Sequence, residues 1–319
     1  MFANTQVITI EEHYWDKEIV DLHVNEMPTR QTDIVQRLYD LDDLRIAEMD
    51  ASGIDIQVVS HGAPSTQRLK GQQAVDVAMR VNDRLAAHIA RHPTRLAGFA
   101  ALPTDVPEAA ARELERCVKT LGFKGAMTHG LCNGEFLDRP RFKPIFQAAN
   151  DLDVPLYLHP ADPSPVVTEA YYSDYVKSFP MVIRPAWGFT VETATQAIRL
   201  ILSGIFKECS RLQIILGHFG ETLPFLLWRI NQSLQRPGQE EIRFRETFCR
   251  HFHVTTSGHF STPALTCTMM EMGMDRIMFS IDWPFVMNDP GLDWVKSLQI
   301  SEADMAKFLG GNAKRLLKL

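Results

Sequence analysis

Eight short runs of β-branched and aromatic residues alternate along this chain with longer stretches of helical period. This alternation is typical of repeated βα units and of a parallel sheet. Eight such units predict an α/β fold of the (β/α)8 TIM-barrel type, although a doubly wound open sheet with fewer strands also fits the pattern. The expected strands are Val7–His13, Ile54–His61, Leu96–Leu102, Phe123–His129, Pro155–His159, Gln213–His218, Phe252–Ser257 and Arg276–Asp282.

The stretches between these strands carry apolar residues at helical spacing. The longest interruption, Pro160–Pro185, directly follows the fifth strand and predicts an active-site loop or lid. No linker, low-complexity stretch or internal repeat divides the 319 residues, so we expect one domain over 1–319. The expected helices are Gln73–Arg91, Pro107–Thr120, Phe142–Asp151, Thr190–Lys207, Thr222–Leu234, Pro263–Met272 and Glu302–Leu317.

Composition narrows the classes of function. The net charge of -6 and the absence of a basic cluster argue against binding to nucleic acid. The segment 1–13 lacks the features of a signal peptide, and no apolar run reaches the length of a membrane helix. Five scattered cysteines without a C-x-x-C pair suit reduced, buried thiols. We therefore expect a cytoplasmic protein.

Polar residues end many of the expected strands, although buried parallel strands should be almost wholly apolar. In a TIM barrel the carboxyl ends of the strands meet at one mouth, where catalytic groups gather. Residues far apart in the sequence would therefore converge there. The strand-end residues are Glu11, Glu12, His13, His61, His129, His159, His218 and Asp282.

The spacing at the end of the first strand predicts which side chains share a face. Glu11 and His13 point the same way because strand side chains alternate, and Glu12 points the other way. Together with His159 and Asp282 they form a mixed nitrogen and oxygen set that suits zinc, manganese or iron. Four such ligands still let a catalytic ion accept water or substrate. We expect one divalent ion at this site.

Each of these signals has a structural alternative, because a single strand-end histidine is more often a hydrogen-bonded packing residue. We interpret the remaining histidines outside the strand ends as structural: His23, His88, His92, His251 and His253. For His61, His129 and His259 the choice between packing and pocket lining stays open. Trp187, Phe189, Trp283 and Phe285 could form an aromatic wall, although single aromatic residues more often belong to the core.

Several segments resemble the strand-end motifs of the amidohydrolase superfamily. Within it, the chain is similar to the branch of aminocarboxymuconate semialdehyde decarboxylase, and above all to dihydroxybenzoate decarboxylases such as the γ-resorcylate and 2,3-dihydroxybenzoate enzymes. The likeness extends in order over essentially the whole chain. The motifs that carry it are Glu11-Glu12-His13, Leu158-His159-Pro160, Gly217-His218-Phe219-Gly220-Glu221, Thr255-Thr256-Ser257-Gly258 and Ile281-Asp282-Trp283-Pro284-Phe285.

The resemblance implies roles for individual residues. It makes Glu11, His13, His159 and Asp282 the metal ligands, and it places His218 beside the metal. Glu221 would orient His218, although a carboxylate at the start of a helix also interacts with the helix dipole. Arg229 is either a structural charge or a partner for Glu221 or for the substrate carboxylate. Trp187, Phe189, Phe285 and His129 are the other candidate substrate contacts.

The resemblance also implies an activity. We expect non-oxidative decarboxylation of a hydroxylated benzoate, with the metal (zinc or manganese) chelating the carboxylate and ortho hydroxyl and Asp282 protonating the ring carbon. No organic cofactor is expected, and the family implies a homodimer or homotetramer. The alternatives are a metal-dependent hydrolase or hydratase, a metal-binding barrel without turnover, and a decarboxylase of a muconate-like acid. One departure concerns the substrate: the family's His-Pro-Arg-Asn-Pro is His159-Pro160-Ala161-Asp162-Pro163 here.

Overall fold

The computed structural model describes residues 5–23, 30–238 and 242–319. Its strands pair in parallel and in chain order, as one sheet from β1 to β3 and a second from β4 to β9. The strands are β1 (Ile8–Tyr14), β2 (Ile56–His61), β3 (Leu96–Gly98), β4 (Ala100–Ala101), β5 (Ala126–His129), β6 (Leu156–His159), β7 (Ile214–Leu216), β8 (Phe252–Thr255) and β9 (Ile277–Met278). Every expected strand contains at least one of them.

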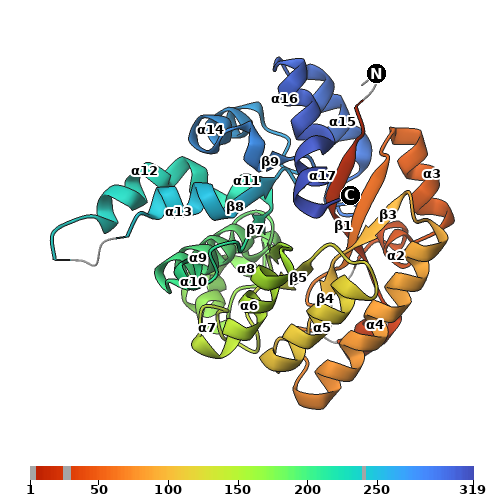
Figure 1. Cartoon of the computed structure of the whole chain (residues 1–319), viewed down its shortest axis with the longest axis horizontal. Coiled ribbons are helices and arrows are strands. Elements are labelled where there is room, and N and C mark those ends of the chain that lie inside the picture. Colours follow the sequence, from red (N-terminus) through yellow and green to blue (C-terminus); the bar gives the residue numbers. More distant parts are fainter. Residues whose placement is uncertain (1–4, 24–29, 239–241) are drawn as a thin grey trace.

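Backbone hydrogen bonds join the two sheets into a closed barrel (Figure 1). Where β3 gives way to β4, Phe99 N donates to Val59 O at 3.0 Å. At the other seam, His13 N donates to Trp283 O at 2.7 Å and Asp282 N donates to Glu11 O at 3.0 Å. The TIM-barrel prediction is thus confirmed, with the third expected strand divided at Phe99.

Side-chain alternation along the strands gives the molecule two apolar cores. One face of each strand fills the barrel interior with residues such as Ile10, Met127 and Met278, and Leu317 near the carboxyl end of the chain packs against this interior core. The other face packs against the surrounding helices in a larger core. This division follows from the period of two in strand side chains.

Helices surround the barrel, and each expected helix is present (Figure 1). The expected Thr190–Lys207 is divided in two, and Glu302–Leu317 contains a π-helical stretch, η5. The helices that match expectation are α4 (Gly71–Arg91), α5 (Pro107–Lys119), α6 (Lys143–Leu152), α9 (Gly188–Leu202), α10 (Ile205–Glu208), α12 (Leu223–Leu234), α14 (Thr262–Met272), α16 (Glu302–Ala306), η5 (Lys307–Gly311) and α17 (Asn312–Leu317).

Several helices were not expected from the sequence. The helix α2 buries only Leu38 and α3 buries only Arg45 and Met49, so little of either helix packs into the core. Unexpected elements are α1 (Lys17–Leu22), α2 (Thr32–Tyr39), α3 (Asp43–Ser52), η1 (Pro140–Phe142), α11 (His218–Glu221), α13 (Phe244–His251), η4 (Met274–Arg276) and α15 (Asn288–Ser297).

The segment expected to be a loop, 160–185, contains short helical turns instead. They are α7 (Pro165–Val167), η2 (Thr168–Tyr172), α8 (Ser173–Val176) and η3 (Pro180–Ile183). Arg184 at the end of this segment donates to both carboxylate oxygens of Asp162, at 2.8 and 2.9 Å. This paired contact fastens the end of the segment to the loop that follows β6.

Among the described residues, no helix has both the length and the apolar character needed to cross a bilayer. Residues 1–4 of the segment 1–13, whose sequence lacks the features of a signal peptide, lie outside the described ranges. All five cysteines are free thiols, as expected.

Candidate metal centre

Four side chains from three distant parts of the sequence meet at one end of the barrel. Glu11 and His13 come from β1, His159 ends β6, and Asp282 follows β9. One ligand atom from each lies within 4.8 Å of all the others. His13 Nε2 is 3.1 Å from Asp282 Oδ1, and His159 Nε2 is 3.3 Å from Glu11 Oε1. Ligand bonds of about 2.0–2.2 Å place donor atoms at roughly such separations around one ion.

The hydrogen bonding of this cluster fits a cation. Glu11 Oε1, His13 Nε2 and Asp282 Oδ1 are buried and have no hydrogen-bond partner among the described residues. Buried polar atoms normally have a hydrogen-bond partner. Three potential metal-ligand atoms that lie close together without one therefore indicate a shared partner. A divalent ion satisfies all three together with His159.

The remaining nitrogen of each histidine ligand is oriented by a neighbour. His159 Nδ1 lies 2.6 Å from Pro160 O, and because a carbonyl only accepts, Nδ1 carries the proton. Its Nε2 lone pair therefore faces the cluster. His13 Nδ1 lies 3.4 Å from Ser60 Oγ on β2. Fixing the tautomer in this way is what a metal-binding imidazole requires.

The second oxygen of Glu11 is held by hydroxyl groups that the sequence reasoning did not identify. Tyr157 and Ser257 donate to Glu11 Oε2, and Thr255 Oγ1 lies 3.4 Å from it. Tyr157 lies on β6 with its side chain in the barrel interior. The Thr255–Ser257 motif was noted only as part of the resemblance. These donors fix the carboxylate so that Oε1 faces the cluster.

Glu12 points away from the cluster, as expected from strand alternation, and positions the Asp282 loop. Its carboxylate accepts hydrogen bonds from Ser280 Oγ, Ile281 N and Trp283 N, each at 3.0 Å. Asp282 itself has a left-handed backbone with φ of 72°. Such strain costs on the order of 1–3 kcal/mol and persists only where the surroundings fix it. Burial raises the pKa of Glu12 to about 8 in spite of these bonds.

His218 lies in a tight turn rather than at the end of a strand, because β7 ends at Leu216. The turn has left-handed backbone at His218, Phe219 and Glu221, with φ between 48° and 55°. It brings Glu221 Oε1 to 2.8 Å from His218 Nδ1, and Thr190 Oγ1 donates to Glu221 Oε2 at 2.8 Å. Glu221 is therefore placed to orient His218.

The charges of the cluster follow from burial and from mutual attraction. Burial lowers the pKa of His13 and of His159 to about 4, so both imidazoles are neutral at pH 7. Burial also lowers the pKa of His218, but Glu221, Glu11 and Asp282 outweigh it and raise that pKa to about 10. Burial and the charge of Glu11 raise the pKa of Asp282 to about 8.

A cavity of about 840 Å³ extends from His218 and Asp282. Its wall is largely apolar and includes Phe219, Phe225 and Trp187. Of the candidate substrate contacts, Trp187 lines this cavity. The cavity is large enough for a single-ring aromatic acid.

The other candidate substrate contacts lie in different surroundings. His129 is buried with its ring 4.8 Å from that of His159, and Phe285 lies 5.5 Å from the ring of His13. Phe189 is half-buried near the start of α9 and is not among the residues that line the cavity. Arg229 is exposed on α12, and the structure does not bring it to Glu221, whose carboxylate binds His218 and Thr190.

Trp283 does not contribute to an aromatic wall. It is fully buried, its indole nitrogen donates to Glu48 Oε2 at 2.8 Å, and the Arg45 guanidinium lies 4.0 Å from the centre of its ring. The hydrogen bond of the indole N–H and the cation over the ring face explain why Trp283 lies in the core and not in the cavity wall.

A family model described as amidohydrolase matches residues 12–319. The chain belongs to the amidohydrolase family. It is 40% identical over 325 residues to γ-resorcylate decarboxylase of Rhizobium sp. (strain MTP-10005), with 98% of each chain covered. The resemblance seen in the sequence is thereby confirmed.

Solved amidohydrolase structures share the fold closely. A dihydroxybenzoic acid decarboxylase from Polaromonas sp. JS666, with bound manganese and the inhibitor 2-nitroresorcinol, is 39% identical and superposes with a TM-score of 0.91, covering 99% of this chain and 97% of that one. A 5-carboxyvanillate decarboxylase from Novosphingobium aromaticivorans, with manganese and a nitrobenzoic acid derivative, is 31% identical with a TM-score of 0.91 and coverage of 99% and 97%.

Proposed function

We propose that this protein is a metal-dependent, non-oxidative decarboxylase of a hydroxylated benzoate. The observation that carries the proposal is the four-donor cluster at the mouth of the barrel, with Asp282 belonging both to the cluster and to the wall of the cavity. Relatives that share 39–40% of their residues with this chain are decarboxylases of dihydroxybenzoates.

Glu11, His13, His159 and Asp282 would hold the ion. When bound, it supplies a Lewis acid that binds the substrate's carboxylate and neighbouring hydroxyl oxygen. Neutral imidazoles and carboxylates suit zinc and manganese alike. We propose manganese as the first ion to test, because the solved Polaromonas and Novosphingobium relatives contain it.

Asp282 is the proton donor in this proposal. In the metal-free protein, burial and the nearby charge of Glu11 favour its protonated form, with a pKa of about 8. A bound cation favours the carboxylate, so we propose that Asp282 takes up its proton as the substrate displaces water from the metal. The proton passes from Asp282 to the ring carbon that bears the carboxylate. The carbon–carbon bond then breaks, its electron pair restores the aromatic ring, and carbon dioxide leaves. Asp282 is left as a carboxylate and takes up a proton from water before the next turnover.

His218 and Glu221 act as a pair beside the donor. Glu221 accepts from His218 Nδ1, which leaves Nε2 as a proton donor. A protonated imidazole here stabilises negative charge on the substrate's phenol oxygen or carboxylate. Trp187 and Phe225 supply apolar side chains to the cavity wall, against which the ring can pack.

The family's His-Pro-Arg motif has Ala161 in place of arginine in this chain, and the charge of Arg30 acts on the neighbouring Asp162 and on Asp282. The Arg30 guanidinium lies 4.5 Å from the centre of the Phe285 ring, and its Nε is buried without a partner among the described residues. The neighbouring Arg184 is already paired with Asp162. We propose that Arg30 receives an anionic or hydroxyl substituent of the substrate.

The proposal is tested by metal analysis together with product analysis. We expect about one ion per chain in the wild type, its loss in a Glu11→Gln/Asp282→Asn double variant, and its retention in the control Asp275→Asn, an exposed acid outside the cluster. Manganese-loaded enzyme assayed in deuterium oxide on a panel of hydroxybenzoates should release carbon dioxide and place deuterium on the ring.

Two results would contradict the proposal. Addition of water to a substrate, without release of carbon dioxide, would make the protein a hydrolase or hydratase on the same scaffold. Metal binding with no turnover of any acid in the panel, muconate-like acids included, would make it a metal-binding barrel.

We also propose a homo-oligomer and a cytoplasmic location. Phe225 and Trp228 on α12 and Met270 on α14, a helix in contact with α12, are large apolar side chains exposed to solvent, which suits association with a second copy. These helices lie at one side of the barrel (Figure 1). Five free thiols favour a reducing compartment. Sedimentation of the wild type and of Phe225→Ser/Trp228→Ser tests the assembly, because the variant should dissociate.

A further inference from the structure

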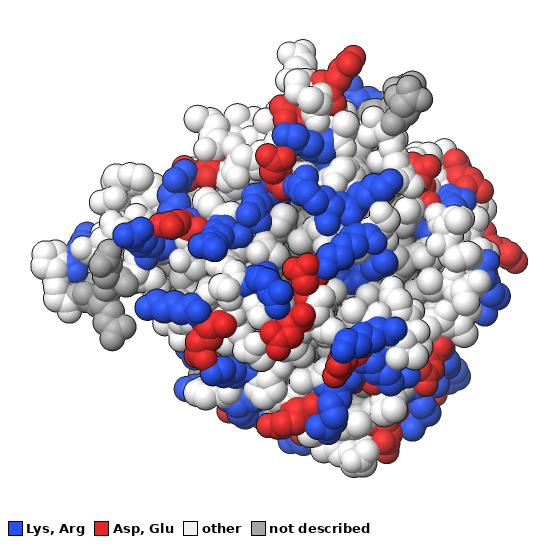
Figure 2. Space-filling model, viewed as in Figure 1, with Lys and Arg blue, Asp and Glu red and all other residues white. Residues whose placement is uncertain are grey.

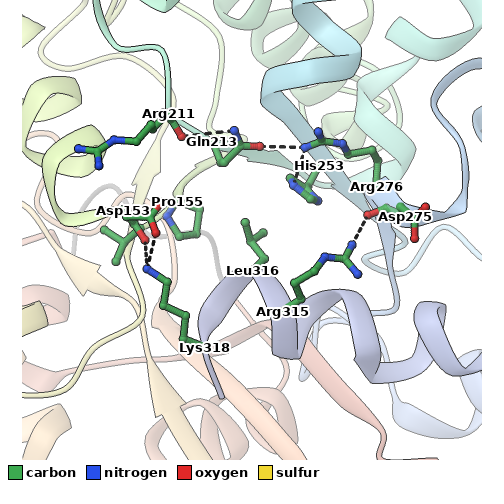
Figure 3. Close-up of a pocket in the computed structure, with 11 residues that line it drawn as sticks. Asp153, Pro155, Arg211, Gln213, His253, Asp275, Arg276, Arg315, Leu316 and Lys318 are labelled. Carbon is green, nitrogen blue, oxygen red and sulfur yellow. Dashed lines mark hydrogen bonds and ion pairs between the residues drawn. The ribbon is translucent and has the colours of Figure 1, made fainter.

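A second cavity, of about 570 Å³, lies at the end of the barrel opposite the metal cluster. Its residues precede the strands rather than follow them: Gln213 comes directly before β7, and Arg276 directly before β9. Figure 3 shows side chains from these strand starts and from α17 surrounding it. The polar side chains that line it are Asp153, Arg211, Gln213, His253, Asp275, Arg276, Arg315 and Lys318.

Arg276 is half-buried in the wall of this cavity without a counter-charge. Its Nη1 donates to Gln213 Oε1 and lies 2.9 Å from His253 Nε2, and both acceptors are neutral. Within the described residues, no carboxylate oxygen lies within 4.0 Å of its guanidinium. Burial lowers the pKa of Arg276 and the charge of Arg315 lowers it further, whereas Cys249 and Asp275 raise it by less. The pocket therefore holds two like charges that repel each other.

Arg315, on α17, also has only neutral partners. Its Nη2 donates to Asp275 O and to Asn312 Oδ1, both at 2.9 Å. The two carboxylates beside the cavity already bind lysines. Asp153 is 2.6 Å from Lys318 Nζ, and Asp275 is 3.0 Å from Lys307 Nζ. The charge of Asp275 also acts on Arg276 and Arg315, but among the described residues neither arginine forms an ion pair with a carboxylate.

His253 adds a neutral donor to the same wall. A guanidinium cannot accept a hydrogen bond, so His253 Nε2 accepts from Arg276 and the proton resides on Nδ1. This buried Nδ1 has no partner in the described part of the chain. Burial, reinforced by Arg276 and Arg315, lowers the pKa of His253 to about 3, so it adds no further positive charge at pH 7.

We propose that this cavity binds a small tetrahedral oxyanion, either inorganic phosphate or the phosphate group of a monoester. Guanidinium groups bind such oxyanions through paired, charge-assisted hydrogen bonds. A dianion would neutralise Arg276 and Arg315 together. Figure 2 shows lysine and arginine side chains over the middle of the face that carries the cavity, with some aspartate and glutamate side chains among them. The site is separate from the proposed decarboxylation.

Calorimetric titration of inorganic phosphate into metal-loaded protein tests the proposal, at constant ionic strength and after removal of free metal. We expect saturable binding with a Kd below about 1 mM and at least tenfold weaker binding in Arg315→Gln, because one charge-assisted contact is lost. The matched control is Arg112→Gln, which removes an exposed arginine of α5 and should bind phosphate as the wild type does. Titration with glycerol phosphate then distinguishes a monoester from free phosphate.

A second variant and a measurement on metal-free protein complete the test. Arg211→Gln replaces an exposed lining residue whose removal does not disturb packing, and it should also weaken binding if Arg315→Gln fails to fold. Metal-stripped protein should bind phosphate as tightly as the loaded protein. The proposal is overturned if no binding saturates below about 10 mM, if Arg315→Gln and Arg211→Gln bind like Arg112→Gln, or if binding disappears with the metal.

Discussion

Replacing Glu221 by glutamine removes the charge that keeps His218 protonated. In the metal-free protein the pKa of His218 is about 10, against an ordinary value of 6.5, although burial by itself lowers it. Glu221 is the largest of the groups that raise this pKa, ahead of Glu11 and Asp282. We therefore expect His218 to lose its proton at a lower pH once Glu221 is neutral.

The magnitude follows from the contacts. A rise of about 3.5 pKa units corresponds to about 5 kcal/mol in favour of the charged imidazole. A charged hydrogen bond at 2.8 Å contributes about 1.5–3 kcal/mol of this. Glu221→Gln should thus lower the pKa of His218 by about one to two units, from about 10 to between about 8 and 9, with Glu11 and Asp282 supplying the rest of the stabilisation.

The assay is an NMR titration of the His218 ring in the metal-free protein between pH 5 and 11. The matched control is Thr190→Val, which removes the other hydrogen bond of Glu221 but leaves its charge, and it should shift the pKa by less than about half a unit. The reasoning is refuted if His218 in Glu221→Gln still titrates near pH 10, or if Thr190→Val has the same effect as Glu221→Gln.

Three further predictions concern separate parts of the molecule. Tyr157→Phe removes a donor to Glu11 and should weaken metal binding about tenfold or more in a chelator competition, whereas Tyr175→Phe at an exposed site should not. The pKa of His253 is about 3 in the folded protein, so as the pH falls below 6.5 the unfolded chain binds this proton before the folded protein does. Between pH 7 and pH 5 the free energy of unfolding, measured in urea, should therefore fall by about 2 kcal/mol less in His253→Gln than in the wild type. An equal fall in both proteins would contradict the burial argument. Arg184→Gln breaks the contact with Asp162 and should speed proteolysis within 165–183 roughly fivefold while metal content stays constant.

Local sequence patterns determined the fold class and most of the metal cluster. Strand alternation depends only on neighbouring residues, so it correctly placed Glu11 and His13 on one face and Glu12 on the other. The rule that the carboxyl ends of barrel strands meet at one mouth then brought His159 and Asp282 to them. Both inferences need no knowledge of packing between distant segments.

Only the tertiary structure decided what surrounds those four side chains. Tyr157 reaches Glu11 because barrel closure sets the register of β6 against β1, and nothing near either residue in the sequence records it. The sequence also does not record that Arg45 and Glu48 contact Trp283 in the core, or that Arg229 lies on the exposed face of α12. Such contacts depend on how elements far apart in the chain pack together, whereas local periodicity reports only which face of an element is buried.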